Sequence, residues 1–503
     1  MTTNEKRQLL HRIIESGLQI APDALSFIMD QDSPSTIVDL ILTDSSSDFA
    51  VITVESLQSI TDAIQDSRWD ILIQKNPDIN LVGSEGTVDD FLSLFRSRFT
   101  QIKQIYEGRL DTSNALSPAA AKLKTFDTQK RREMIRRGLK TEKAPNHNVI
   151  GMIKSKKVSQ SGNIIFELED FKDSLLCIIP GNALDSNGRP LSEKGNSLLI
   201  DEVICVSGYV NQDQRMIVRD IIFPDIPAAR ISGCANRDVY AVFISDLHVG
   251  SQEFLEDEFH GFINWLRGID VNPELKHVVE QTRYLFIAGD LIDGIGVYPG
   301  QRTDLLLPDV YDQYKMLSKF LKMVPDKIKI ICIPGNHDAC RQALPKPPIP
   351  KQFAKPLYDL GDQISLLGDP SQVRVEGVSV LLTHGDSQDD LVTNIPGVSY
   401  KEPGASMKEL LKKRHLAPIY GGKTEIAPLR TDWMVIDQVP DIVHFGHAHH
   451  HAVGSYHNVL IINSSTFQAQ TEFMKKQGID PTPGIVTYVN LHSGKPNSLN
   501  FIR

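Results

Sequence analysis

The spacing of hydrophobic and polar residues changes twice along the chain and divides it into three regions. In the first region, apolar residues recur at helical intervals in residues 9–14 and 54–64, and Ser33-Pro34 has the residue types that begin a helix. Several short helices without reactive side chains are typical of an interaction module. The pattern therefore predicts a small helical interaction module over residues 1–68.

The second region begins with a helix and continues into short strands. Phe91, Leu94, Phe95 and Phe99 share one helical face, and the small, polar stretch 113–121 is typical of a linker. Strand-forming runs separated by Gly, Asn and Ser follow at residues 149–153, 164–168, 174–179, 203–210 and 216–223. Five short strands fit a small β-barrel of the oligonucleotide-binding (OB) type, a shape that does not by itself imply contact with DNA. We expect an OB-fold domain with a preceding helical, basic linker over residues 69–235.

The linker contains the strongest basic run of the chain. Residues 122–143 carry nine Lys and Arg side chains. A solvated helix face is the favoured interpretation, and a stripe that contacts phosphates is the alternative. Both interpretations stay open at this point.

The third region alternates strands and helices. Short runs rich in Val, Ile and Leu, typical of buried central strands, occur at residues 240–245, 283–288, 328–333, 378–383, 442–445, 459–462 and 485–489. Between the first three of these runs, residues 259–266 and 317–324 have the apolar spacing of helices that cover a sheet. The chain is therefore predicted to be multidomain α/β, with β-sheets flanked by helices over residues 236–503.

Composition limits the classes of protein. The 503 residues are 41% hydrophobic and 23% charged, which excludes a collagen, a coiled-coil rod and a mostly disordered chain. No apolar run is long enough to span a bilayer and the first twelve residues lack the apolar core of a signal peptide, so we expect no membrane contact. Five cysteines without a CxxC pair favour neither disulfides nor a thiolate zinc site, and a cytoplasmic location is expected. The net charge of −10 argues against a uniformly basic nucleic-acid surface.

Five of the predicted strands are followed at once by residues that can bind metal. The segments are Ser245-Asp246-Leu247-His248, Gly289-Asp290-Leu291-Ile292-Asp293, Gly335-Asn336-His337-Asp338, Thr383-His384-Gly385 and Gly446-His447-Ala448-His449. Ligands of open α/β sheets bind beyond the carboxyl ends of the strands, so these polar groups are expected to converge. Taken singly, each motif also fits a turn or a surface cluster. Their common position at strand ends favours a ligand-binding site.

The donor set indicates the kind of ligand. It contains three carboxylate or amide oxygens and four imidazoles, without a thiolate. This mixture suits Mn²⁺, Mg²⁺, Fe²⁺ or Zn²⁺. Seven donors exceed the needs of one ion, so the sequence predicts two divalent metal ions, with a carboxylate shared between them.

These motifs, in this order, resemble the calcineurin-like metallophosphoesterase superfamily, over about residues 238–490. The resemblance implies that Asp246, His248 and His449 hold one metal, that Asn336, His384 and His447 hold the other, and that Asp290 bridges them. It also implies that His337 contacts the scissile phosphate and protonates the leaving oxygen, while Asp338 orients it. The protein phosphatases of this superfamily have an Arg soon after the second motif and a Glu in the third. Here Gly294 and Asp338 stand at those places, which argues against that branch.

A barrel ahead of such a domain is similar to the small subunit of archaeal D-family DNA polymerases (DNA polymerase II). The similarity includes the runs at residues 243–251 (FISDLHVGS), 414–423 (RHLAPIYGGK) and 441–444 (DIVH). It implies a 3′→5′ exonuclease that proofreads single-stranded or mismatched DNA 3′ ends and uses two metal ions, Mn²⁺ first among them. It also implies a large catalytic DNA polymerase subunit as partner in a heterodimer or larger complex.

Two other functions and several histidines stay open. A stand-alone DNA-repair metallo-nuclease and a non-catalytic scaffold subunit are the alternatives. His415, in the RHLAP segment, is a candidate substrate contact or a packing residue. His444 is expected to be a core or supporting residue, and His450 and His451 are expected at the rim of the site.

Overall fold

The computed structural model describes residues 12–13, 19–29, 38, 51–54, 57, 69–78, 83–139 and 143–502. The chain forms two compact units, Met1–Asp70 and Ile71–Arg503. In the first unit, helix α2 (Pro22–Met29) accompanies a parallel strand pair, β1 (Gln19–Ile20) and β2 (Val51–Ile52). The helix predicted to begin at Ser33, and most of those predicted at residues 9–14 and 54–64, lie outside the described residues. A helical module therefore stays a prediction.

The predicted five-stranded barrel is confirmed. Its strands are β5 (His147–Val158), β6 (Ile164–Glu169), β7 (Ser174–Ile179), β8 (Val203–Asn211) and β9 (Met216–Ile222), and the short β4 (Thr125–Phe126) adds to β8. Strand β8 pairs with both β5 and β9, and β9 pairs in parallel with β7, which closes the barrel. Helix α8 (Leu191–Asn196) joins β7 to β8. The assignment of this barrel to the OB class stays a prediction.

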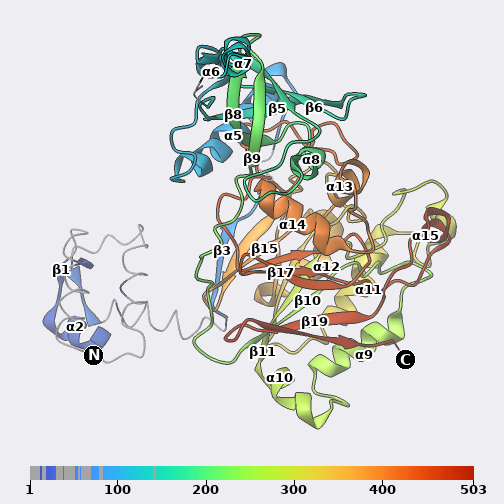
Figure 1. Cartoon of the computed structure of the whole chain (residues 1–503). Coiled ribbons are helices and arrows are strands. Elements are labelled where there is room, and N and C mark those ends of the chain that lie inside the picture. Colours follow the sequence, from blue (N-terminus) through green and yellow to red (C-terminus); the bar gives the residue numbers. More distant parts are fainter. Residues whose placement is uncertain are drawn as a thin grey trace. The chain divides into compact units, whose positions relative to one another are not determined.

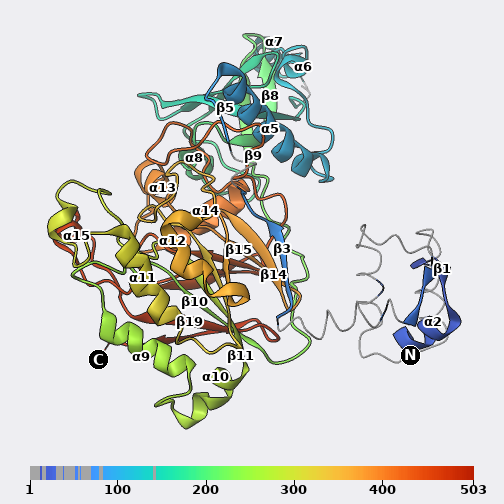
Figure 2. The ribbon, with the colours of Figure 1, turned by 180° about the vertical axis from the view of Figure 1, so that it is seen from behind.

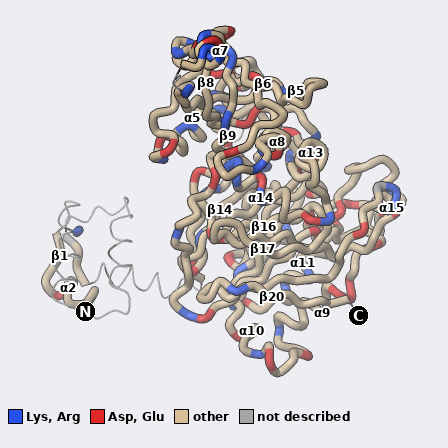
Figure 3. The backbone as a smooth tube through the Cα atoms, viewed as in Figure 1, with Lys and Arg blue, Asp and Glu red and all other residues tan. Residues whose placement is uncertain are grey.

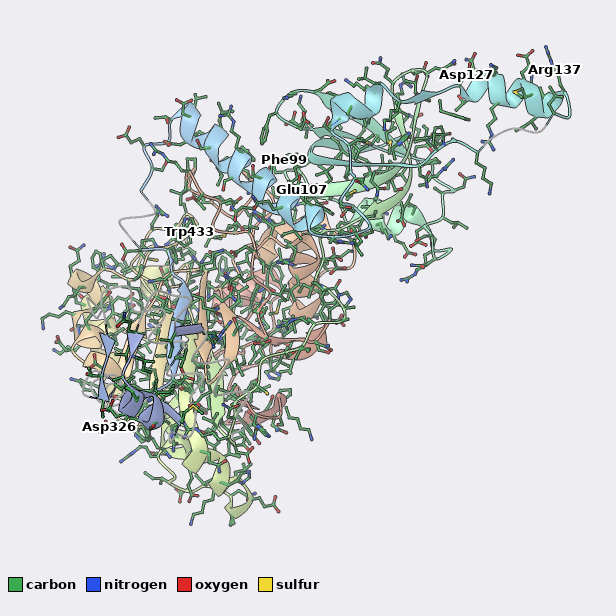
Figure 4. The ribbon with its side chains drawn as sticks, turned by 90° about the vertical axis from the view of Figure 1, so that its left-hand side faces the viewer. Phe99, Glu107, Asp127, Arg137, Asp326 and Trp433 are labelled. Carbon is green, nitrogen blue, oxygen red and sulfur yellow. The ribbon has the colours of Figure 1, made fainter. Side chains whose placement is uncertain are left out.

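Within residues 83–139, three helices precede the barrel. They are α5 (Val88–Glu107), α6 (Pro118–Lys122) and α7 (Thr128–Arg136). The prediction that residues 113–121 form a free linker is wrong. This stretch contains most of α6, and Leu116 forms a β-bridge with Val149 of β5. Helix α7 carries part of the basic run and lies at an end of the barrel, where basic and acidic positions of the chain are close together (Figure 3); Asp127 and Arg137 mark its two ends in Figure 4.

The third region contains two six-stranded sheets. The first has the order β13 (Ile364–Leu366), β12 (Lys329–Ile333), β11 (Thr282–Ala288), β10 (Tyr240–Ile244), β19 (Ile485–Asn490) and β20 (Lys495–Asn500). The second has the order β17 (Ala452–Tyr456), β18 (Val459–Asn463), β16 (Ile442–Phe445), β15 (Val378–Leu382), β14 (Ser371–Val375) and β3 (Ile71–Lys75). All seven predicted strands of this region are therefore confirmed.

Strand β3 does not lie in the domain in which the sequence places it. It comes from the segment expected to precede the barrel, yet it pairs antiparallel with β14 at the edge of the second sheet. The side chain of Asn76, next to β3, accepts a hydrogen bond from the Gly368 amide at 2.8 Å. The chain thus begins this domain with β3, continues through α5 and the barrel, and returns to the domain at β10.

The two sheets pack face to face between layers of helices. The rings of Phe243 on β10 and His444 on β16 meet edge to face with centroids 5.1 Å apart, so the inner faces of the sheets are in contact. Helices α9 (Glu256–Leu266) and α11 (Val310–Leu321) pack against the first sheet and α14 (Pro403–Lys413) against the second (Figures 1 and 2). The remaining helices are α10 (Lys276–Gln281), α12 (Lys351–Tyr358), α13 (Gln388–Asn394) and α15 (Glu472–Gln477), with 3-10 helices at Pro273–Leu275, Gln301–Thr303 and Gly361–Gln363.

Two buried ion pairs tie α5 and the barrel to this domain. Arg98 of α5 lies 2.7 Å from Asp432, and Lys413 of α14 lies 2.7 Å from Glu202 beside β8. All four side chains are buried. Charges buried this deeply hold a fixed geometry, because separating either pair leaves an unpaired charge in the interior.

Among the residues that the structure describes, there is no helix of the length and apolar character that crossing a membrane requires.

Candidate metal centre

The loops after five strands meet at one place between the two sheets. Strands β10, β11 and β12 of the first sheet run parallel, as do β15 and β16 of the second. Each carboxyl end is followed by one of the predicted donors. The structure brings together all seven of them, namely Asp246, His248, Asp290, Asn336, His384, His447 and His449.

A first group of donors is formed by Asp246, His248 and His449. The Nε2 atoms of the two histidines are 3.0 Å apart, and His449 Nε2 is 3.3 Å from Asp246 Oδ1. All three side chains are buried. Metal–ligand bonds of about 2.1 Å place neighbouring donors about 3.0–3.4 Å apart, so this group has the dimensions of a metal site.

A second group is formed by Asn336, His384 and His447. The amide oxygen of Asn336 lies 3.0 Å from His384 Nε2 and 3.2 Å from His447 Nδ1. Asp290 stands between the groups, because its Oδ2 is 3.7 Å from His248 Nε2 and 3.3 Å from His384 Nε2. A carboxylate in this position can contact an ion in each group.

Outer hydrogen bonds orient three of the four imidazoles. His384 Nδ1 donates to the Ala288 carbonyl at 2.8 Å, and His248 Nδ1 is 3.0 Å from Asp293 Oδ1. His447 Nε2 is 3.0 Å from Asp389 Oδ1. Each bond leaves the other ring nitrogen free to face the centre, the arrangement typical of histidine ligands in metalloproteins.

The backbone at the donors is strained. Five of them have left-handed φ angles, with values of 52° at Asp246, 49° at His248, 48° at Asp290, 66° at His447 and 53° at His449. Such conformations cost about 1–3 kcal/mol each for residues with a β-carbon and cluster at functional sites. The fold therefore imposes these positions against local preference.

Close approach of the loops requires glycine at two positions. A β-carbon on Gly335 would lie 2.1 Å from Asp290 Oδ1, and one on Gly289 would lie 2.5 Å from His384 Nδ1. Gly289 also has a φ of +86°. The Gly-Asp and Gly-Asn pairs of the motifs thus have a steric reason, since a side chain in either place would push the donors apart.

The electrostatics of the centre favour a bound cation. Burial alone would lower the pKa of His384, but the carboxylate of Asp290 beside it raises that pKa to about 10. In turn, although burial alone would raise the pKa of Asp290, His384 and the neighbouring histidines hold it well below the usual range. A proton on His384 occupies the position that a divalent ion would take, so the residues present fit the two predicted metals.

A cavity of about 490 Å³ opens over the donors. His248, Asp290, Asn336, His447 and His449 reach its wall. Its remaining wall includes Tyr298, His337, Asp389, Tyr400, Lys423 and Phe473. The volume falls within the roughly 300–1,000 Å³ of ordinary ligand pockets.

Comparison with known proteins identifies the family. The model of the family that comprises the B-type subunits of DNA polymerases alpha and epsilon matches residues 241–453. A DNA polymerase II small subunit from Archaeoglobus fulgidus is 41% identical over 80% of this chain and 75% of its own length. Another from Methanothermobacter thermautotrophicus is 32% identical over 96% of this chain and 98% of its own.

The chain belongs to the DNA polymerase II small subunit family. A member from Pyrococcus horikoshii is 38% identical over 82% of this chain, which spans 63% of that longer relative. Among solved structures, an archaeal phosphodiesterase is 12% identical and covers 52% of this chain and 99% of its own, with a TM-score of 0.27. A phosphoesterase from E. coli is 15% identical over 52% of this chain and all of its own, with a TM-score of 0.24.

The structure does not show the expected contact between His337 and Asp338. His337 lies at the cavity with its ring centroid 4.6 Å from that of His248. Asp338, expected to orient it, instead accepts hydrogen bonds from the Gly335 and Leu291 amides and from the Tyr314 hydroxyl. Asp338 therefore holds the turn that presents the loop. Burial raises its pKa to about 6.

Three carboxylates of the site were not predicted as site residues. They are Asp293, Asp386 and Asp389. Asp386 approaches His384 and His447 within 4.0 and 3.9 Å, and its other oxygen pairs with the fully buried Lys346 at 2.5 Å. Asp293 is the last residue of the GDxxD motif, so its place in the sequence offered a signal. Asp386 follows His384 in a turn and Asp389 is in the first turn of α13, and neither belongs to a recognisable sequence pattern.

The remaining histidines are placed as follows. His415 is buried and bonds Asp432 at 3.0 Å, beside Arg98, and it does not reach the cavity wall, so the structure gives no support for substrate contact. His444 is buried between the sheets with Nε2 2.7 Å from Ser464 Oγ, as expected of a core residue. His451 bonds Thr487 at 2.9 Å, outside the donor groups.

Proposed function

We propose that this chain is a metal-dependent 3′→5′ exonuclease that removes nucleotides from single-stranded or mismatched DNA ends within a DNA polymerase complex. The observation that carries the proposal is the position of Asp290, which lies between two donor groups at the floor of an open cavity. Two cations bound there would lower the pKa of a water molecule and stabilise the charge that develops on a phosphate.

The protein groups have distinct parts in this reaction. Asp246, His248 and His449 would hold one ion, Asn336, His384 and His447 would hold the other, and Asp290 would contact both. Water attacks the phosphorus of the terminal phosphodiester and loses one proton to solvent, and the bond from phosphorus to the 3′ oxygen of the preceding nucleotide breaks. His337, protonated on Nε2 as well as Nδ1, gives the Nε2 proton to that oxygen and regains one from solvent, so the products are a nucleoside 5′-monophosphate and a shortened strand with a free 3′ hydroxyl.

Manganese is the proposed ion, with Mg²⁺, Fe²⁺ and Zn²⁺ as the alternatives that the same oxygen and imidazole donors accept. Asp338 supports the reaction indirectly, because its hydrogen bonds to the Gly335 and Leu291 amides hold two of the donor loops together.

The family relationship supports a partner. Relatives named as small subunits imply a large catalytic subunit, and we propose that this chain binds one through its barrel and N-terminal unit. The barrel, proposed to be of the OB type, lies beyond α14 from the sheets that carry the metal centre (Figure 1), and none of its residues lines the cavity, so we propose that it offers the partner a surface apart from the cavity. The basic helix α7 is a further candidate for contact with the partner or with template DNA.

The test is a product assay on the purified chain. With Mn²⁺ and single-stranded DNA labelled at its 5′ end, we expect a ladder that shortens from the 3′ end and releases 5′-mononucleotides. Asp257→Asn, an exposed carboxylate of α9, is the matched control for substitutions in the centre. Cuts within paired DNA or release from the 5′ end would instead indicate a repair nuclease. Absence of hydrolysis with two ions bound would indicate a scaffold.

A further inference from the structure

Two aromatic side chains form one wall of the cavity beside the metal centre. Tyr298 follows the GDxxD motif, and Phe473 is in the first turn of α15 (Glu472–Gln477). Their rings are stacked, with centroids 4.8 Å apart and an interplanar angle of 24°. Both line the same cavity as the metal donors.

The aromatic pair is held in place but not covered. The Tyr298 hydroxyl donates to Asp304 at 3.1 Å, and Thr471 caps α15 by accepting from the Met474 amide at 3.1 Å. Phe473 nevertheless leaves 39% of its surface exposed, and Val297 beside Tyr298 leaves 37%. An apolar surface kept open at a cavity wall is available to a ligand.

The pair lies within one nucleotide of the reacting groups. The ring centroid of Tyr298 is 6.4 Å from that of His337, whose own centroid is 4.6 Å from that of His248. Lys423, an exposed cation, also reaches the cavity. The cavity therefore joins a site for a phosphate, a planar apolar wall and a positive side chain that can meet the next phosphate of a strand.

We propose that Tyr298 and Phe473 form a stacking platform for the nucleobase of the 3′-terminal nucleotide. This inference rests on the proposed function and names how its substrate is recognised. Every base has a π face, so a stacking wall accepts all four nucleotides without reading their edges, which suits an enzyme that removes whichever nucleotide is terminal. A paired base cannot reach the wall until it leaves the duplex, so the platform selects frayed or mismatched ends.

The test compares two oligonucleotides that differ only at the 3′ end. One carries a terminal base and the other an abasic residue at the same position, so both offer the same scissile phosphodiester. For the unmodified chain with Mn²⁺, we expect kcat/KM to be roughly 5- to 100-fold higher with the base, the range for one base–aromatic stack. For F473A and F473L the ratio should fall toward one. Phe473→Leu keeps an apolar side chain and loses only the ring.

Controls separate stacking from a structural role. Phe171→Ala removes a ring that is 56% exposed on the barrel and does not line the cavity, so the preference for the base should remain. A fall in kcat/KM by the same factor on both oligonucleotides in F473L would overturn the platform, because the ring would then act on the site rather than on the base.

A binding measurement distinguishes failure of this inference from failure of the proposed function. In F473W, the new indole should be quenched by a single-stranded oligonucleotide and much less by one whose 3′-terminal residue is abasic, with the unmodified chain as the blank for its own Trp residues. Quenching without hydrolysis would keep the platform and overturn the exonuclease. Hydrolysis with equal rates and equal quenching for both oligonucleotides would keep the exonuclease and overturn the platform.

Discussion

The Nδ1–H of His337 donates a hydrogen bond to the main-chain carbonyl oxygen of Asp293 at 2.7 Å. A carbonyl oxygen only accepts, so this bond places the hydrogen on Nδ1 and leaves Nε2 as the nitrogen that exchanges a proton. The His337 amide in turn donates to Asp290 Oδ1 at 2.8 Å. His337 is thus fixed by hydrogen bonds to the two acidic residues of the GDxxD motif.

This geometry predicts that binding and catalysis separate in His337→Ala. We expect the variant to keep both metals and to lose about 10²–10⁴ in rate, the effect of removing a general acid. Metal content by elemental analysis and exonuclease rate should be measured on the same preparation. A loss of metal in this variant would make His337 a ligand and would contradict its assigned role.

Asp290→Asn should have the opposite pattern. The amide keeps the shape of the side chain but removes the charge that faces both donor groups. We therefore expect loss of at least one ion and of measurable hydrolysis. The free energy of unfolding of the metal-free chain should fall at pH 7.5, because the charged imidazole of His384 loses its carboxylate partner in the interior. Full activity with two ions bound would contradict the bridging role, and Asp257→Asn should behave as the unmodified chain.

Metal binding should release protons. In the absence of metal, the carboxylate of Asp290, which outweighs the effect of burial, keeps the pKa of His384 at about 10, so this imidazole is charged at pH 7.5. A cation must displace that proton, so the apparent affinity for Mn²⁺ should weaken as pH falls. Calorimetric titration in two buffers of different ionisation enthalpy measures the number of protons released, which we expect to be about one or more per chain. A value of zero would place the ions elsewhere.

The sequence was sufficient for those features that depend on local patterns. Each donor directly follows a buried strand, as Asp290 follows β11, and the period of apolar residues marks that strand without knowledge of its neighbours. The resemblance to the metallophosphoesterase superfamily then implied the division of the donors into two groups. The stacked aromatic pair was not visible in this way, because Tyr298 and Phe473 lie in unrelated segments.

Long-range pairing could not be read from the sequence. Strand β3 pairs with β14 across nearly 300 intervening residues. The short apolar run that forms β3 is flanked by polar residues and has no feature that identifies the strand with which it pairs. The hydrogen bonds that Asp338 accepts could not be read from the sequence either. His337 is adjacent to Asp338 in the sequence, yet the Asp338 carboxylate accepts hydrogen bonds from the backbone amides of Gly335 and Leu291. These partners are known only from the three-dimensional structure.

Arg98 should be important for stability and not for the metal centre. Its guanidinium donates to Asp432 at 2.7 Å and to the Pro418 carbonyl at 2.5 Å, and its side chain is fully buried. Arg98→Met leaves Asp432 buried without its guanidinium partner, and His415, 3.0 Å away, remains hydrogen-bonded to it. We expect the free energy of unfolding to fall by about 3–5 kcal/mol in urea titrations. The double variant Arg98→Met, Asp432→Asn should recover part of that loss, whereas equal stability of all three proteins would show that the pair contributes nothing.

The boundary between the two units gives a last prediction. Deleting residues 1–68 removes the first unit and keeps β3, so hydrolysis by the isolated chain and its stability should stay nearly unchanged. Deleting residues 1–78 also removes β3, together with the bonds from Asn76 to the Gly368 amide and from Lys75 to the Val435 carbonyl. At about 1 kcal/mol for each hydrogen bond, the longer deletion should cost at least about 2 kcal/mol and expose the edge of β14. Urea unfolding of the two truncated chains measures the difference. Equal stability would mean that β3 is not part of the second sheet, while a large loss in the shorter deletion would mean that the first unit supports the second.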